Sequence, residues 1–321
     1  MALDVSALND FNNEVAGKIV LDTVYKGNTA EYISIQEGIK HQEPINLVSV
    51  APYFQGGDAV TTFSGSADFT QRNITVTKRT AQDAWNLQTL TSKYLGVSAL
   101  PEGSYEETMN LLNDLTGDLV AKAQQDNDNF IWNCASGSAY SGGLTPSEDG
   151  LKVIISGSTA GVKVPSASQT GSAEFGAAIT ADNAYDQLVD GLALADVNVL
   201  DADDLSIMCG TKVFQRIVSG LTKQNLFHFD PTSVQKRGGF YEVPLPGYPN
   251  VKIIGTYGLR DSERVVIGMA SDAFVGTDLV SDTNNFKLWY DINTDTLRYR
   301  LRNKLGMQIA HPAYWVSNDL A

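Results

Sequence analysis

The spacing of apolar residues predicts a first helix close to the beginning of the chain. Over residues 5–20 apolar side chains recur every three or four positions, which is the period of a helix with one buried face. These side chains are Val5, Leu8, Phe11, Val15 and Ile19. We therefore predict an amphipathic helix that belongs to an N-terminal arm.

Two extended segments follow, separated by a polar stretch that contains glycine. Residues 45–54 are rich in strand-forming side chains and end shortly before Gly56 and Gly57, and residues 74–78 alternate between apolar and polar side chains. The polar residues between these segments offer little apolar surface to bury. The pattern predicts a long β-hairpin over residues 45–80 that projects from the body of the protein.

A long helix is predicted over residues 104–134. Ser104 and Glu107 have the spacing of a capping box at its start, and apolar positions with a helical period continue to Cys134. At 1.5 Å per residue this helix forms a rod about 45 Å long. The rod is acidic, since it carries one lysine, Lys122, against Glu106, Glu107, Asp114, Asp118, Asp126 and Asp128.

The middle of the chain predicts a mixed α+β region. Residues 137–180 are rich in Gly, Ser, Thr and Ala, with short strands expected at 151–155 and 162–164 before a surface insertion. Beyond them we expect helices at 181–195 and 211–221, strands at 205–209, 251–256 and 264–269, and a loop punctuated by Gly and Pro at 236–249.

The C-terminal part contains the clearest strand of the sequence. Leu297, Tyr299 and Leu301 alternate there with Arg298, Arg300 and Arg302. Phe286, Leu288 and Tyr290 precede it, and the residues 291–295 between the two runs have turn composition. This arrangement predicts an antiparallel hairpin with one apolar face and one basic face.

Composition and charge exclude several classes of protein. The 321 residues carry a formal net charge of −14, whereas a compact reader of DNA sequence needs a basic field. Two distant cysteines are too few for a disulfide framework and favour a reducing compartment. The first twenty residues lack the basic region and apolar core of a signal peptide, so we expect none there, and the sequence has no apolar run long enough for a transmembrane helix. We expect a soluble protein made in the cytosol, without a membrane partner.

No metal site is complete in the sequence. His41, His228 and His311 are isolated, although Asp230 lies close to His228. Residues 291–295 imitate the opening of a calcium loop, but Thr296 and Arg302 stand where glycine and glutamate are required. The acidic residues 201–204 are better explained as a solvated loop. We predict no metal.

No catalytic or cofactor-binding motif is complete either. The Gly-Gly pairs at 56–57, 142–143 and 238–239 lack the lysine and hydroxyl of a phosphate-binding loop. Cys134 lies on the expected buried face of the long helix, where a core thiol is favoured over a nucleophile. We therefore predict no catalytic residue and no cofactor.

The basic face of the C-terminal hairpin has three interpretations. Arg298, Arg300 and Arg302 have a spacing that could follow phosphates, could pair with acidic side chains of a neighbouring subunit, or could simply be solvated. We favour the protein contact, because the rod helix supplies acids. The candidate inter-subunit contacts are Arg298, Arg300, Arg302, Arg72, Lys78, Glu106, Glu107, Asp114 and Asp118.

Several segments, in the same order, resemble the major capsid proteins of tailed phages with the Hong Kong 97-type fold, in particular those of phages of Bacteroidetes (crAss-like phages and relatives). They are FTQRNITVTK followed by AQDAWNL, FIWNCAS at the end of the long helix, EDGLKVI after it, and VGTDLVSDTNNFKLWYD followed by LRYRLRNKLGMQIAHP. The resemblance covers most of the chain from residue 69 onward.

This resemblance implies an α+β chain with the Hong Kong 97-type organisation. It implies an N-terminal arm (1–44), an E-loop (45–80), a P-domain with a spine helix (81–180), an A-domain (181–280) and returning P-domain strands (281–321). The E-loop is then expected to overlap the P-domain of a neighbouring subunit, and the A-domain to pack around the capsomer axis.

The resemblance also implies a function without catalysis. The chain is expected to assemble with itself into pentamers and hexamers of an icosahedral shell that encloses double-stranded DNA, in the host bacterial cytoplasm and then in the virion. A portal, a separate scaffolding protein and decoration proteins are expected partners. Lys78 and Arg79 lie at the base of the hairpin, which argues against cross-linking at its tip. The alternatives are an encapsulin-type nanocompartment shell and a soluble enzyme with an unrecognised site.

Overall fold

The computed structural model describes residues 19, 22, 29–52, 65–86, 105–165, 175–224, 235–237, 240–278, 286–294 and 296–320. The helix predicted over 5–20 lies outside these residues, except for Ile19, which is helical and buried. The tip of the predicted hairpin, Ser104 of the predicted capping box, and His228 also lie outside them.

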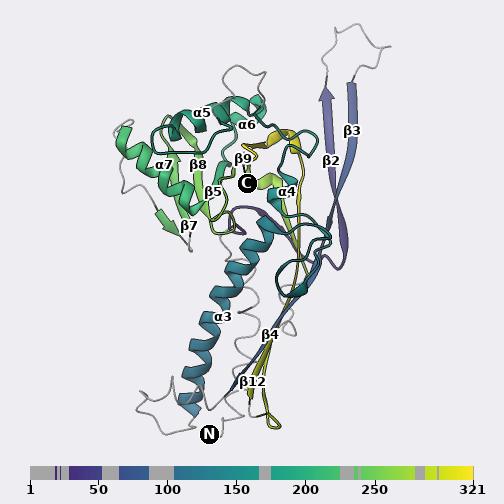
Figure 1. Ribbon diagram of the computed structural model, residues 1–321. Coiled ribbons are helices and arrows are strands. Elements are labelled where there is room, and N and C mark those ends of the chain that lie inside the picture. Colours follow the sequence, from purple (N-terminus) through teal and green to yellow (C-terminus); the bar gives the residue numbers. More distant parts are fainter. Residues whose placement is uncertain are drawn as a thin grey trace.

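One half of the molecule is built on a six-stranded sheet covered by helices (Figure 1). In spatial order its strands are β13 (Val316–Ser317), β9 (Val265–Met269), β5 (Leu205–Gly210), β8 (Tyr248–Thr256), β7 (Phe240–Leu245) and β6 (Gln235–Arg237). The helices are α5 (Ala184–Leu194), α6 (Val197–Leu200) and α7 (Thr211–Gln224). The central strand β5 is buried along its whole length, so both of its faces are covered.

The other half is a long sheet beside a long helix. Strand β12 (Thr296–Ile309) pairs with β4 (Thr77–Asn86) along one edge and with β11 (Phe286–Asp291) and β10 (Ala273–Thr277) along the other. Strand β1 (Ser34–Gln36) adds to β10 in parallel. The helix α3 (Tyr105–Asn133) packs Leu112 and Leu119 against Leu297 and Leu301 of β12.

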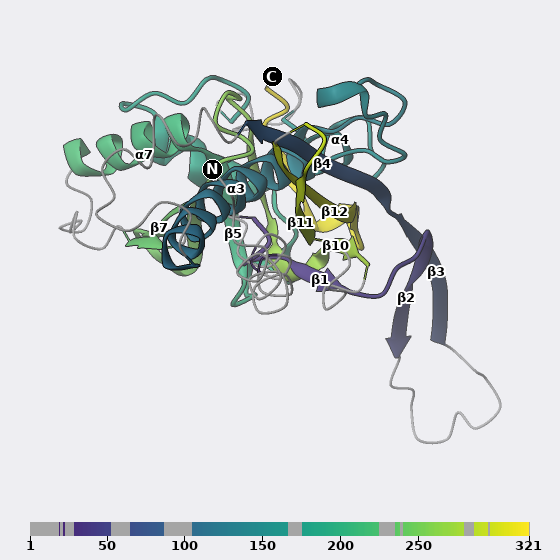
Figure 2. The same cartoon turned by 90° about the horizontal axis from the view of Figure 1, so that it is seen from below.

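The third part is a two-stranded ribbon. Strands β2 (Gln42–Pro52) and β3 (Gly65–Thr75) pair antiparallel over their full length and extend away from both sheets (Figure 1). Seen from below, the ribbon leaves the body on the side opposite α7 (Figure 2). The chain then turns at Val76 into β4, so the ribbon and the long sheet are covalently continuous.

Most of the elements expected from periodicity are confirmed. The predicted rod at 104–134 is α3, and the hairpins expected over 45–80 and 286–302 are β2–β3 and β11–β12. The helices expected at 181–195 and 211–221 are α5 and α7, and the three predicted strands at 205–269 are β5, β8 and β9. The strand expected at 162–164 is reduced to a bridge between Lys163 and Val316.

Two predictions are wrong. Residues 151–155 form a helical turn, α4 (Leu151–Ile154), because the amides of Val153 and Ile154 both donate to the Gly150 carbonyl while Leu151 is buried beneath. The predicted loop at 236–249 contains β7 and the start of β8, joined by a tight turn at Gly247, whose φ of 87° favours glycine. The strand tolerates Pro244 because the pairing shifts there.

Candidate assembly surfaces

The outer face of the ribbon presents an apolar pair to solvent. Val48 and Phe69 lie directly opposite each other in the β2–β3 register, and they are 56% and 75% exposed. Beside them Gln71 donates a 2.7 Å hydrogen bond to Asn46. A two-stranded ribbon is marginally stable alone, and here its largest side chain is left in water. This face is therefore suited to being covered by another molecule.

The base of the ribbon crosses the long sheet where that sheet has no side chains. Gly276 of β10 and Gly306 of β12 are register partners, and a Cβ on Gly306 would overlap the Thr75 carbonyl. A Cβ on Gly276 would meet Ile39 and Ile74, which form a small buried cluster with Val76. The backbone of the ribbon can approach this closely only because both positions are glycine.

The loop before α4 also binds the place where the ribbon meets the long sheet. The Ser147 amide donates to the Thr77 hydroxyl at 2.9 Å, and the Met307 amide donates to Glu148 Oε2 at 3.3 Å. Glu148 also accepts from the Thr75 amide and side chain. Partial burial raises the pKa of Glu148 to about 7, against these hydrogen bonds, which lower it.

This carboxyl predicts a pH dependence of stability. Its pKa is about 7 in the folded chain and 4.5 in the unfolded chain, so the folded state binds more protons between these values. The contribution of Glu148 to stability therefore falls as pH rises from about 4.5 through about 7. We expect Glu148→Gln to be more stable than the wild type at pH 8 and similar to it at pH 5, measured by urea unfolding.

The control for this experiment is Glu37→Gln, at an exposed position of the same chain. It should follow the wild-type pH profile. An unchanged profile for Glu148→Gln would show that this carboxyl does not titrate differently on folding.

Arg79 fixes the beginning of β4 to the long helix. Its side chain is buried, donates to Asn127 Oδ1 at 2.7 Å, pairs with Asp126, and lies 4.2 Å from the centroid of the Phe130 ring. Asn127 Oδ1 also accepts from Asn303 of β12. The arginine therefore connects α3 to β4 directly and, through Asn127, to β12. The sequence pattern around Arg79 does not indicate this structural role.

Asp128 connects three distant segments at the end of α3. Its carboxylate accepts from the amide and hydroxyl of Thr29 and from the Gly258 amide, the latter at 2.5 Å. Trp132 Nε1 donates to the same Thr29 hydroxyl at 2.7 Å. Complete burial raises the pKa of Asp128, and the hydrogen bonds oppose that shift. The helix, the chain before β1 and the turn after β8 are thereby joined.

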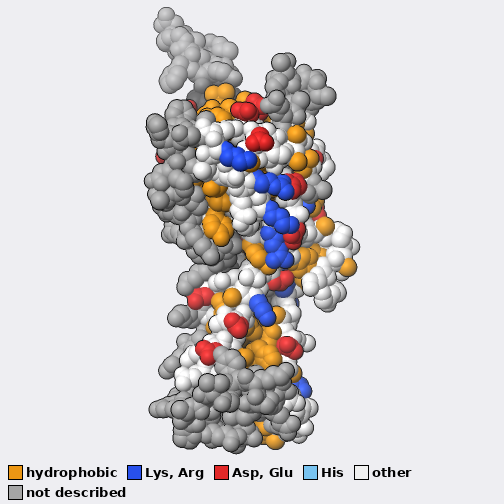
Figure 3. Space-filling view, turned by 60° about the vertical axis from the view of Figure 1, so that its left-hand side comes forward, with side chains coloured by type: hydrophobic (Ala, Val, Ile, Leu, Met, Phe, Trp, Pro, Cys, Tyr) orange, Lys and Arg blue, Asp and Glu red, His pale blue; other side chains and the backbone are white. Residues whose placement is uncertain are grey.

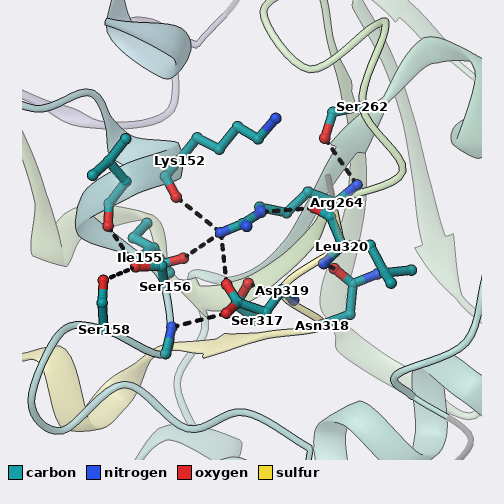
Figure 4. A network of polar contacts seen from close by, with 12 residues as sticks. Lys152, Ile155, Ser156, Ser158, Ser262, Arg264, Ser317, Asn318, Asp319 and Leu320 are labelled. Atoms are coloured by element: carbon teal, nitrogen blue, oxygen red, sulfur yellow. Dashed lines mark hydrogen bonds and ion pairs between the residues drawn. The ribbon is translucent and has the colours of Figure 1, made fainter. Parts of the chain in front are cut away.

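The C-terminal segment is held by Arg264 (Figure 4). Its buried guanidinium donates to the carbonyls of Lys152, Ile155 and Leu320 and pairs with Asp319 at 2.9 Å. Burial lowers the pKa of Arg264, and Asp319 opposes this shift. The network ties α4, β9 and the last residues together.

A histidine–aspartate pair missed by the sequence analysis lies nearby in the fold. His311 Nδ1 is 2.6 Å from Asp272 Oδ1, and the same carboxylate accepts from the His311 amide and, at 2.8 Å, from Trp315 Nε1. No sequence spacing signals this pair, because 39 residues separate its members. Asp272 accepts hydrogen bonds from His311 and Trp315, so the pair holds the C-terminal segment against the rest of the fold and has a structural role. Within the described residues no group of three His, Cys, Asp or Glu could hold a metal ion.

The predicted basic face exists on β12. Arg298, Arg300 and Arg302 lie on the face turned away from α3, together with Lys304, Lys287 of β11 and Lys78 of β4. Arg298 pairs with Asp291 at 3.0 Å, and Lys304 with Asp278 at 2.6 Å. We call these six cations the basic sheet face.

The structure does not bring the predicted acids to this face within one chain. Asp114 and Asp118 are exposed on α3, on the other side of the sheet, and the side chains of Glu106 and Glu107 are outside the described set. Arg72 lies on the inner face of the ribbon opposite Ile45, where burial lowers its pKa while nearby Asp272 raises it. Lys78 is exposed.

The charges on α7 are arranged differently. Lys212, Arg216 and Lys223 pair with Asp261, Glu263 and Asp182 at 3.5, 2.6 and 3.7 Å. Figure 3 shows the flank that carries α7 and α3, with cations and acids side by side on the body and mostly acidic charges on the narrower part below. The three cations of α7 therefore have acidic partners within the subunit.

The described elements form a projecting ribbon, a long helix–sheet arm and a compact α+β lobe. Solved capsid structures share this arrangement at low sequence identity. One is the satellite phage P4 procapsid including size determination (Sid) protein. A chain of that structure aligns with a TM-score of 0.56 at 9% identity, over 94% of this chain and 97% of that one.

Two further structures give the same result. The capsid of an empty GTA particle aligns with a TM-score of 0.53 at 10% identity, covering 91% of this chain and 89% of that one. Microbacterium phage Oxtober96 gives 0.53 at 9% identity, covering 91% and 90%. No family model and no curated protein matches the sequence. The chain therefore has the Hong Kong 97-type capsid fold, as expected.

No helix within the described residues is long and apolar enough to cross a membrane.

Proposed function

We propose that this chain is the major capsid protein of a tailed bacteriophage, related to those of phages of Bacteroidetes. Its copies assemble into hexamers and pentamers of an icosahedral shell around double-stranded DNA. The observation that carries this proposal is the fold common to the P4 procapsid, the GTA capsid and the phage Oxtober96 chain, over about nine-tenths of their lengths. The segment resemblances from residue 69 onward support it independently.

The parts of the subunit take their roles from this proposal. The ribbon, within the E-loop (45–80), covers part of the P-domain of a neighbour, because its outer face holds an exposed apolar pair. The lobe at 181–280 packs around the capsomer axis as the A-domain. The segments 81–180 and 281–321 form the P-domain behind an N-terminal arm (1–44).

The proposed partners follow from the same assembly. The chain associates with itself, with a portal and with a separate scaffolding protein, and it accepts decoration proteins. It encloses DNA without reading its sequence, which suits a protein with a net charge of −14, because like charges repel. Assembly takes place in the host cytoplasm, and the protein ends in the virion. We propose no catalytic role.

An encapsulin-type compartment would use the same fold around an enzyme cargo. Neighbouring genes separate the two: terminase, portal and tail genes accompany a phage capsid, and a peroxidase or ferritin-like gene accompanies a compartment. The third possibility is a soluble enzyme, which would form a discrete monomer or small oligomer with a ligand pocket.

Electron microscopy of the purified full chain tests the proposal. We expect shells, sheets or ring-shaped capsomers, because assembly and coverage of the ribbon are one event. A monodisperse species of 34.7 kDa at all concentrations and salt conditions would contradict it.

A further inference from the structure

The long helix and the basic sheet face lie on opposite flanks of the subunit. Helix α3 covers one face of the β4–β12–β11 sheet through Leu112 and Leu119, and the basic sheet face is the other side of that same sheet. Figures 1 and 2 agree that α3 lies on one side of the arm and the strands on the other. Each subunit thus presents a helix on one flank and a sheet face on the opposite one.

The basic sheet face contains charge arrangements that a strand pair normally avoids. Lys78 of β4 is directly opposite Lys304, and Lys287 of β11 is directly opposite Arg300. Like charges at directly opposed positions destabilise a sheet. Although Arg298 and Lys304 pair with Asp291 and Asp278, these like-charge oppositions would be relieved by an anionic partner.

Two arginines of this face have donors that the single subunit leaves unused. The Nε groups of Arg300 and Arg302 are buried and have no hydrogen-bond partner among the residues that the structure describes. A buried N–H without an acceptor is costly, and native structures rarely keep one. Arg300 also lies 6.0 Å from the ring centroid of Trp289, which is itself partly exposed. The subunit alone therefore leaves one donor of each of these two side chains unsatisfied.

The exposed side of α3 supplies acids at a matching spacing. Asp114 and Asp118 are exposed and one turn apart, so they are separated by about 6 Å along the helix. Arg300 and Arg302 are two residues apart on a strand, which is about 7 Å. Beyond Lys122, one turn further along α3, Asp126 pairs with Arg79 and Asp128 is buried, so the acids available for a partner lie before Lys122.

We propose that the basic sheet face of one subunit binds the acidic exposed side of α3, at Asp114 and Asp118, of a second copy of the chain. This inference rests on the proposed function, and it names the surfaces through which neighbours in a capsomer meet. The two surfaces are different and lie on opposite flanks, so the contact is heterologous, which is the type of contact that forms rings when its rotation closes. Nucleic acid is the competing occupant, and the net charge of −14 disfavours it.

Charge exchange tests the contact. Arg300→Glu with Arg302→Glu, and separately Asp114→Lys with Asp118→Lys, should each fold normally by circular dichroism and lose at least about tenfold in shell yield. Combining all four substitutions should restore shells at the wild-type net charge. The matched control combines the two arginine reversals with Asp201→Lys and Asp203→Lys, at exposed positions on a different loop, and should not restore them.

Mixing the two folded variants gives a sharper test. Alternating the variants around a ring makes every contact complementary, which is possible in hexamers but not in pentamers. The mixture should therefore form six-membered rings, sheets or tubes in the microscope, without closed shells.

The outcomes separate the inference from the function on which it rests. Normal shells from either reversed variant, or no rescue in the fourfold variant, would overturn the contact while leaving the capsid role intact. So would a wild-type subunit that binds a 30-base-pair DNA duplex at about 150 mM salt through Arg300 and Arg302, because DNA would then be the occupant. Failure of the wild type to assemble at all would instead remove the proposed function.

Discussion

Replacing Val48 and Phe69 together by aspartate should abolish shell formation and leave the subunit folded. Both side chains are mostly exposed on the single chain, so little packing is lost, and the repulsion between two directly opposed aspartates should lower the free energy of unfolding by about 1 kcal/mol. In a shell each side chain would be buried, and each is worth roughly 1.5–3 kcal/mol when fully removed from water. Charged groups in their place would also need to be desolvated. Negative-stain microscopy and urea unfolding measure the two effects separately.

The matched control is Val48→Ile with Phe69→Leu, which keeps the face apolar and should assemble. If the aspartate variant makes normal shells, the outer face of the ribbon is not an assembly surface. If it unfolds, the face has a role within the subunit that its exposure does not reveal. The pair is a better target than the polar Asn46 and Gln71 beside it, since these already bond to each other.

Much of the architecture could be predicted because its signals are local. The helical period over 104–134 and the two-residue alternation over 297–302 are set by which side of each element is buried, and they identified α3 and β12. The run at 151–155 could not be assigned in this way. A short apolar run is compatible with a strand or a buried helical turn, and here the hydrogen bonds to Gly150 decided for the turn.

The candidate surfaces were predictable only in part. The three arginines of β12 could be assigned to one face from their alternation. The opposition of Lys78 with Lys304 depends on the register between strands more than 200 residues apart, and no local pattern contains that register. The glycine pair at 276 and 306 is hidden for the same reason, because its importance comes from the ribbon that crosses it.

The largest effect on folding is expected at Asp128, which no local pattern distinguishes from the other acids of the long helix. Asp128→Ala should lower the free energy of unfolding by roughly 3–5 kcal/mol, because it strands the donors of Thr29 and Gly258 in a buried site. Asp128→Asn should also lower the free energy of unfolding. The asparagine Nδ2 group can only donate, so it cannot accept from Thr29 or Gly258 as one of the carboxylate oxygens does. Urea unfolding at pH 7 measures both changes.

The matched control is Asp118→Ala, an exposed aspartate of the same helix, which should change the free energy of unfolding by at most about 0.5 kcal/mol. The distinction follows from the partners of Asp128. Thr29 is 99 residues away and Gly258 is 130 residues away, so the carboxylate closes two long loops at once. An Asp128→Ala chain as stable as the wild type would mean that this junction is held by the packing of Trp132 alone, since that ring contacts both Thr29 and the Gly258 turn. A destabilised chain that still assembles would separate the integrity of the subunit from the surfaces that join it to its neighbours.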